Sequence, residues 1–258
     1  MTEDFKNAAG LIDAPIFMPL GRKKAYEEVG DEIRKLIHSR RLQPSHRLPT
    51  ERDLAEQFGV SRMVVREAIR TLERSGLLAV KKGPRGGIFV TQQYDRPITD
   101  SIANLLAGGG ADLENLFEMR LLIEPFAASR AADLASGEEL DQLTALLQDA
   151  DKASASLPDL RSHNIEFHRT ILRISRNPVM GMIGDAVLTI LSNRIKDVLS
   201  PDTSHQALGM HRKILEALRK RQSGKAKTLM EEDIQATGRR LAELGPEALR
   251  QLAANTIF

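Results

Sequence analysis

The sequence has no cysteine among its 258 residues. This absence excludes disulfide scaffolds, thiolate metal sites and cysteine nucleophiles. Long apolar runs are also missing, since no stretch approaches the ~20 apolar residues that a membrane helix needs. The first 15 residues lack the apolar segment of a secretory signal. We therefore expect a globular, cytoplasmic protein with no membrane partner.

Positive charge is concentrated in one short segment, although the formal net charge of the whole chain is only +2. Residues 1–95 hold 17 Lys and Arg against 13 Asp and Glu, a balance of +4, and residues 96–258 have a balance of −2. Residues 61–91 alone carry a balance of +5. Such a concentration is typical of a polyanion-binding surface. Charge alone favours the alternative, a solvated basic helix, so further signals are needed.

Local patterns predict three helices in the first third of the chain. Apolar residues at the spacing of one helix face predict a helix over residues 24–39. Thr50, with Asp53 three residues later, is close to a capping box and starts a second helix that ends at Gly59. Only two residues separate this helix from Ser61, which is expected to cap a third helix.

Two short β-prone runs flank a Gly/Pro-rich turn in residues 77–90, which predicts a hairpin. Helix, helix, tight turn, helix and hairpin is the order of a winged helix-turn-helix. From about Thr99 helical periods run almost to the end without a strand pattern, which predicts an antiparallel all-helical bundle of six or seven helices. The predicted fold is therefore mostly α.

The predicted organisation has five parts. They are a flexible arm (1–22), the winged helix-turn-helix (23–91), a linker (92–99), a helical domain (100–245) and a C-terminal tail or short helix (246–258).

The start of the third helix carries the candidate base-reading residues, because the second helix of such a motif lies in the major groove. Arg62 is the strongest candidate, since a guanidinium can donate two hydrogen bonds to guanine O6 and N7. Such a contact discriminates against the other bases by ~1–3 kcal/mol. Met63 lies beside it, and Arg66, one turn on, could reach a base or a phosphate. Ser61 and Arg52 are placed for phosphate or groove-edge contacts.

The hairpin would follow the DNA backbone or the minor groove through Lys82, and Gly83 would permit a close approach there. Arg70 and Arg74 lie far along the third helix. We expect them to be solvated or paired with neighbouring glutamates rather than to contact DNA.

These residues resemble the DNA-binding domain of GntR-type bacterial transcription regulators. The likeness is carried by residues 48–55 (LPTERDLA), 58–62 (FGVSR), 65–72 (VREAIRTL) and 82–90 of the hairpin. By this resemblance, the family's DNA-contacting positions fall on Arg52, Ser61, Arg62, Arg66 and Gly83.

The helical region is similar to the FCD domain, the ligand-binding bundle of the fatty-acid-regulator-like branch of that family. Residues 118–124 (EMRLLIE), 164–168 (NIEFH) with the Asn-Pro pair at 177–178, and 211–233 carry this likeness. The resemblance implies that a helical bundle binds a small effector and regulates the DNA-binding domain.

Histidines point to a metal site in this region. Asn164 and His168 are four residues apart and so project from one helical face. His168 and His211, with one or two oxygen ligands, would make a metal site inside a bundle. By resemblance the family's ligand positions fall on Asn164, His168, His211 and Asp233. The first is often Asp and the last usually His in the family. We expect a divalent metal, with zinc first and nickel or manganese as alternatives.

Arg120 is the candidate partner of an effector carboxylate, because an Arg on an apolar helix face can bind a carboxylate bidentately. An internal salt bridge to Glu124 is the alternative. His163 and His205 match no ligand position and are expected at the surface.

The expected function is a metabolite-responsive transcription regulator, more often a repressor in this family, and not an enzyme. A homodimer would bind a palindromic operator in double-stranded DNA, and a small organic acid would bind in the bundle. Three alternatives remain at this stage: an acyl-thioester-sensing regulator without a functional metal site, a metal-dependent hydrolase fused to a DNA-binding domain, and an architectural DNA-binding protein without a ligand.

Overall fold

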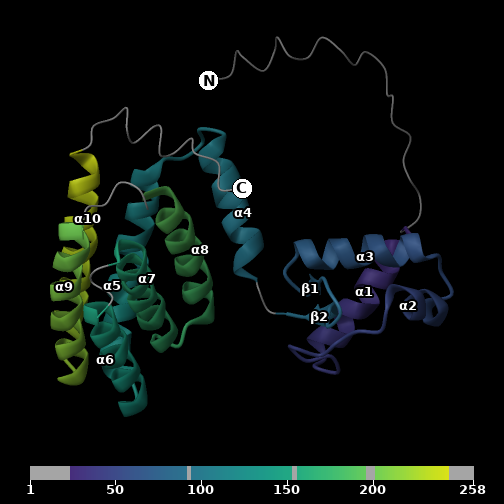
Figure 1. The fold of residues 1–258 in the computed structure, drawn as a ribbon, viewed down its shortest axis with the longest axis horizontal. Coiled ribbons are helices and arrows are strands. Elements are labelled where there is room, and N and C mark those ends of the chain that lie inside the picture. The colour runs from purple at the N-terminus through teal and green to yellow at the C-terminus, as the bar shows by residue number, and fades with distance from the viewer. Residues whose placement is uncertain (1–23, 92–93, 153–155, 196–200, 244–258) are drawn as a thin grey trace, which may run out of the picture. The chain divides into compact units, whose positions relative to one another are not determined.

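The computed structural model describes residues 24–91, 94–152, 156–195 and 201–243. The chain divides into two compact units, Met1–Gln92 and Gln93–Phe258 (Figure 1). The expected N-terminal arm (1–22) and C-terminal tail (246–258) lie outside the described residues.

The first unit is a winged helix-turn-helix, as predicted. Its elements are α1 (Ala25–His38), α2 (Glu51–Phe58), α3 (Arg62–Arg74), β1 (Leu78–Lys81) and β2 (Gly87–Val90). The strands pair antiparallel with Leu78 opposite Val90 and Lys81 opposite Gly87.

Local side-chain contacts fix the helix ends of this unit where the sequence places them. The Thr50 hydroxyl accepts from the Asp53 backbone N–H, and the Asp53 carboxylate accepts from the Thr50 N–H, which confirms the capping box. Gly59 ends α2 in the left-handed region at φ 65°. Only two residues later the Ser61 hydroxyl accepts from the Val64 N–H and caps α3. The turn between the two helices is therefore tight.

The apolar faces of α1 and α3 meet in the core of the first unit. The buried side chains of α3 are Val65, Ala68, Ile69 and Leu72, and those of α1 include Val29, Ile33 and Ile37. Because this face is inside, the opposite face of α3 with its arginines is left to solvent.

The second unit is all-helical in its described residues, and its helices lie alongside one another (Figure 1). Its helices are α4 (Asp95–Ala107), α5 (Leu113–Leu134), α6 (Gly137–Lys152), α7 (Leu157–Ile174), α8 (Pro178–Ile195), α9 (Pro201–Arg219) and α10 (Ser223–Ala242). The helix α5 packs against α7, α8, α9 and α10. None of the helices in the described residues is long and apolar enough to cross a membrane.

The predicted linker at residues 92–99 overlaps α4, which begins at Asp95. Pro97 suggested an interrupted chain, but it lies in the first turn of α4. The N–H groups of a first turn have no partner within the helix, so a proline there removes no hydrogen bond.

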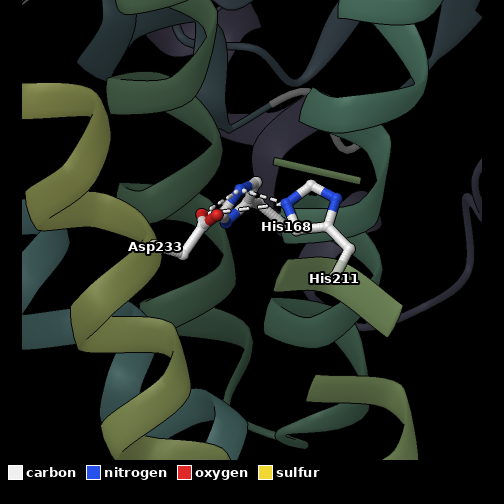
Figure 2. A group of neighbouring side chains, drawn as sticks. All are labelled: His168, His211 and Asp233. Carbon is white, nitrogen blue, oxygen red and sulfur yellow. Dashed lines mark hydrogen bonds and ion pairs between the residues drawn. The ribbon is translucent and has the colours of Figure 1, made fainter. Parts of the chain in front are cut away.

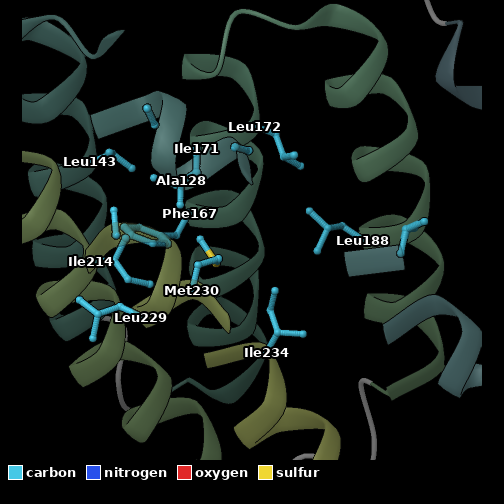
Figure 3. Close-up of a cluster of buried hydrophobic side chains, with 14 of the residues drawn as sticks. Ala128, Leu143, Phe167, Ile171, Leu172, Leu188, Ile214, Leu229, Met230 and Ile234 are labelled. Atoms are coloured by element: carbon cyan, nitrogen blue, oxygen red, sulfur yellow. The ribbon is translucent and has the colours of Figure 1, made fainter. Parts of the chain in front are cut away.

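The bundle core surrounds Phe167 at the middle of α7. Figure 3 shows this ring beside Ile214 of α9 and Met230 of α10, and all three side chains are buried. Three polar residues, His168, His211 and Asp233, lie within three positions of these apolar residues on the same helices.

Candidate functional site

The start of α3 presents its side chains to solvent. Arg62 and Met63 occupy its first two positions and both are exposed, Met63 to 74%. A methionine with this exposure contributes nothing to the core, so it is available for contact with a partner. The structure thus leaves the predicted base-reading positions open.

Arg66, one turn on, is already engaged. Its Nε lies 3.1 Å from both carboxylate oxygens of Glu51, and its Nη2 donates to Glu51 Oε2 at 2.7 Å. The hydrogen bond from Arg66 holds the pKa of Glu51 below its usual value. This pair joins α2 to α3, and the sequence interpretation missed it because 15 residues separate its members.

The other arginines of the unit form looser pairs. Arg52 contacts Glu56 through a single hydrogen bond of 3.1 Å on the exposed surface of α2. Arg70 and Arg74 both lie within 3.8 Å of Glu67, which confirms the pairing expected for them.

The turn of the wing carries Lys82 and Gly83, both exposed. Gly83 has φ 100°, a conformation that favours glycine. Arg47 stabilises this turn, since its Nη2 donates to the Gly86 carbonyl at 2.8 Å. The DNA-contacting roles of all these residues stay predictions.

Three buried side chains converge in the bundle. His168 of α7, His211 of α9 and Asp233 of α10 point toward one another (Figure 2). The two histidine Nε2 atoms are 3.2 Å apart, and Asp233 Oδ2 lies 3.3 Å from His168 Nε2 and 3.7 Å from His211 Nε2. The Phe167 ring stacks on His211 at 4.1 Å between centroids and fixes its plane.

This spacing fits a metal ion. Zinc bonds of about 2.0–2.1 Å in a tetrahedron place ligand atoms about 3.3–3.4 Å apart, close to the observed distances. Two Nε2 atoms 3.2 Å apart cannot both carry a proton along the line between them, so at least one lone pair faces the cluster. Two imidazoles and one carboxylate are also donors that zinc accepts.

Glu124 of α5 completes the arrangement and was missed as a site residue by the sequence interpretation. Its Oε2 lies 2.5 Å from His168 Nδ1, on the far side of the ring from the cluster. A carboxylate at this position keeps the proton on Nδ1 and leaves Nε2 as the ligand atom. No local sequence signal indicates this contact across 44 residues.

Arg120 pairs with the same glutamate. Its Nε donates to Glu124 Oε1 at 2.6 Å and its Nη2 lies 3.3 Å from Oε2. The internal salt bridge is therefore formed in the structure. Whether Arg120 also binds an effector stays a prediction.

The electrostatics keep both carboxylates charged. Burial raises the pKa of Glu124, but Arg120 and His168 outweigh it and lower this pKa to about 2. Burial likewise raises the pKa of Asp233, but His211 and His168 outweigh it and hold this pKa well below its usual range. Burial lowers the pKa of His211, which favours its neutral form as a ligand.

The remaining predicted residues of the bundle lie on α7 and α9. Asn164 is half-buried on α7, one turn before His168, and its role as a fourth ligand stays a prediction. His205 is exposed on α9, and His163 is half-buried with its Nδ1 2.7 Å from the Asp159 carbonyl oxygen.

Fold and site together define a class: a winged helix-turn-helix DNA-binding protein with a helical domain that holds a buried polar cluster. Comparison with known families gives the particular family. The profile described as "Bacterial regulatory proteins, gntR family" matches residues 25–90, and the profile "FCD domain" matches residues 115–236. The chain belongs to the GntR family of transcription regulators, in the group with an FCD domain.

Two relatives match most of the chain in sequence. The chain is 30% identical over 218 residues to the "HTH-type transcriptional repressor NanR" of Cronobacter sakazakii (strain ATCC BAA-894), covering 81% of this chain and 82% of the relative. It is 30% identical over 203 residues to the protein of the same name from Escherichia coli O127:H6 (strain E2348/69 / EPEC), covering 76% of this chain and 73% of the relative.

A solved structure described as Streptococcus agalactiae GntR superposes with a TM-score of 0.61 at 26% identity, covering 83% of this chain and 99% of that one. Since the families and relatives are transcription regulators, the chain is a DNA-binding regulator and not the hydrolase considered as an alternative.

Proposed function

We propose that this regulator is a repressor that binds a palindromic operator as a homodimer and senses a small organic acid beside a divalent metal. One observation carries the proposal. Three buried side chains, His168, His211 and Asp233, each offer one ligand atom within 4.8 Å of the others, in the same chain as a winged helix-turn-helix. Buried charged groups are costly unless they are paired or bind a metal. A metal in a sensing site would therefore account for the burial of this cluster.

Repression and dimerisation are supported from outside the cluster. Both relatives carry the word repressor in their names. A single recognition helix reads only a half-site, whereas a two-fold dimer places two helices one turn of DNA apart and matches a palindrome. The protein would act on DNA in the cytoplasm.

The sensor residues have separate tasks. His168, His211 and Asp233 would hold the metal, and Asn164 would be its fourth protein ligand. When bound, the ion supplies positive charge for an effector carboxylate. Glu124 occupies Nε and Nη2 of Arg120, so we propose that the Nη1 side of this guanidinium meets the effector.

Effector binding would change operator affinity by a coupling of about 1–3 kcal/mol. The test uses full-length protein, zinc, and a panel of sugar acids, hydroxy acids and dicarboxylates. A thermal-shift screen selects the acid that stabilises the protein, and its effect on operator binding is then measured.

We expect the selected acid to shift operator affinity of the wild type and to have little effect on the H168A/H211A double variant. The matched control is H163A/H205A, which removes two histidines outside the cluster and should respond like the wild type. An equal response in the two double variants would contradict the proposed site. Stabilisation by acyl thioesters alone, without a metal, would favour the acyl-thioester alternative.

A further inference from the structure

The face of α3 that points away from the core carries three arginines on successive turns, Arg62, Arg66 and Arg70. Their positive charges repel one another, and each long side chain has many rotamers. Glu51 lies beside the middle one, and its carboxylate also feels the charges of the outer two. An acidic residue on a surface meant for a polyanion weakens DNA binding in general, so its presence needs a reason.

The geometry of the pair supplies that reason. A guanidinium has five N–H groups arranged along two usable edges. Glu51 bonds Nε and Nη2, which is the side edge of Arg66. The end edge, made by Nη1 and the outer hydrogen of Nη2, keeps two parallel N–H groups. That fork fits guanine O6 and N7.

We infer that Glu51 is a positioning residue that holds Arg66 with its end edge toward the bases and makes it a base reader rather than a phosphate contact. The anchor for this role is firm. Glu51 is the first residue of α2, next to the Thr50 cap, so its backbone is fixed. The pair is half-exposed, with 44% of the Arg66 side chain accessible, so Arg66 can still reach a partner.

The charge of Glu51 adds a second effect. Phosphates approach every part of the protein's basic surface in non-specific complexes, and a carboxylate there repels them. A base edge carries no net charge and is not repelled in this way. Glu51 therefore weakens non-specific binding and strengthens specific binding, and these opposite effects separate positioning from a structural role.

The test rests on operator recognition as proposed above, and it begins with the wild type. Full-length protein selects its preferred duplex from a random pool. Dissociation constants are then measured on this duplex and on a scrambled duplex of the same composition. The variants are E51Q, E51D and R66A, with E67Q as the control, because Glu67 is also an acid beside arginines but makes only distant contacts of 3.6–3.8 Å.

We expect E51Q to lower the ratio of specific to scrambled affinity by about tenfold, the size of one lost base contact. Operator binding should weaken while scrambled binding strengthens. E51D keeps the charge but shortens the side chain, so it should lower the ratio without strengthening scrambled binding. E67Q should strengthen binding to both duplexes and leave the ratio unchanged.

Single-base substitutions in the operator locate the effect, since E51Q and R66A should lose preference at the same base pair. Thermal unfolding confirms that each variant is folded. An unchanged ratio in E51Q, or a ratio shift equal to that of E67Q, would overturn the role proposed for Glu51. Such a result would leave the proposed operator recognition intact. A wild type without any preference between the duplexes would overturn the proposed operator recognition, and this inference with it.

Discussion

Two ion pairs in this molecule have the same residues at the same spacing in opposite surroundings. Arg52 and Glu56 lie on the surface of α2 with side chains 75% and 66% exposed. Arg120 and Glu124 lie inside the bundle with side chains 6% and 1% exposed. Water can solvate the charges of the first pair if it separates, whereas the charges of the second pair are buried among protein groups.

This contrast extends to the two units. In the winged domain the side chains predicted to contact DNA are exposed and contribute nothing to the core. In the bundle the polar cluster lies among the residues that hold the helices together. Function and stability are therefore separable in the first unit and coupled in the second.

The largest expected effect comes from the buried pair. E124A leaves the buried Arg120 charge without its carboxylate and removes the partner of His168 Nδ1. Removing one member of a buried pair costs about 3–5 kcal/mol, and we expect a loss of this size in the free energy of unfolding by urea. E56A, its exposed counterpart at the same spacing, should change this free energy by less than about 0.5 kcal/mol.

Comparable losses in E124A and E56A would contradict the contrast, since burial would then make no difference to the pair. The urea transition of the bundle should be followed separately from that of the winged domain. If the two units unfold independently, only the bundle transition should move in E124A.

The next variant should change DNA recognition and leave the stability of the protein unchanged. R62A removes an exposed side chain at the start of α3, so its melting temperature should equal that of the wild type. Operator preference should fall by about 1–3 kcal/mol, the value of a bidentate base contact. Fluorescence anisotropy on operator and scrambled duplexes measures this difference. R74A is the control, because Arg74 is paired with Glu67 far from the start of the helix. An R62A variant that keeps full operator preference would show that Arg62 reads no base.

The smallest expected effect tests whether the winged domain unfolds independently of the bundle. T50A removes the hydroxyl that accepts from the Asp53 N–H at the start of α2. Loss of such a cap costs about 1 kcal/mol. We expect this loss in the unfolding transition of the winged domain and none in that of the bundle. A shift of both transitions by the same amount would contradict their independence.

The sequence was informative wherever the signal is local. The Thr50–Asp53 box, Gly59 and Ser61 lie within a few residues of the contacts they make, so spacing alone predicted them. The start of α4 was the exception, because Pro97 is as compatible with a first helical turn as with a linker.

The bundle site could not be assembled from local patterns. Its ligands come from α7, α9 and α10, and the family resemblance placed them rather than any periodicity. The spacing of Arg120 and Glu124 suggested their pairing, yet the bond from Glu124 to His168 depends on how α5 packs against α7. Likewise, Glu51 and Arg66 meet only because α2 packs against α3.

The proposed sensing role depends most on whether the buried cluster of His168, His211 and Asp233 holds a metal. The most direct measurement is the metal content of purified full-length protein after zinc loading and removal of free ion, compared between the wild type, H168A/H211A and the H163A/H205A control. We predict a single tightly held divalent ion per chain in the wild type and the control, and none in H168A/H211A. A wild type that retains no ion, or a H168A/H211A variant that retains as much as the control, would contradict the proposed metal site.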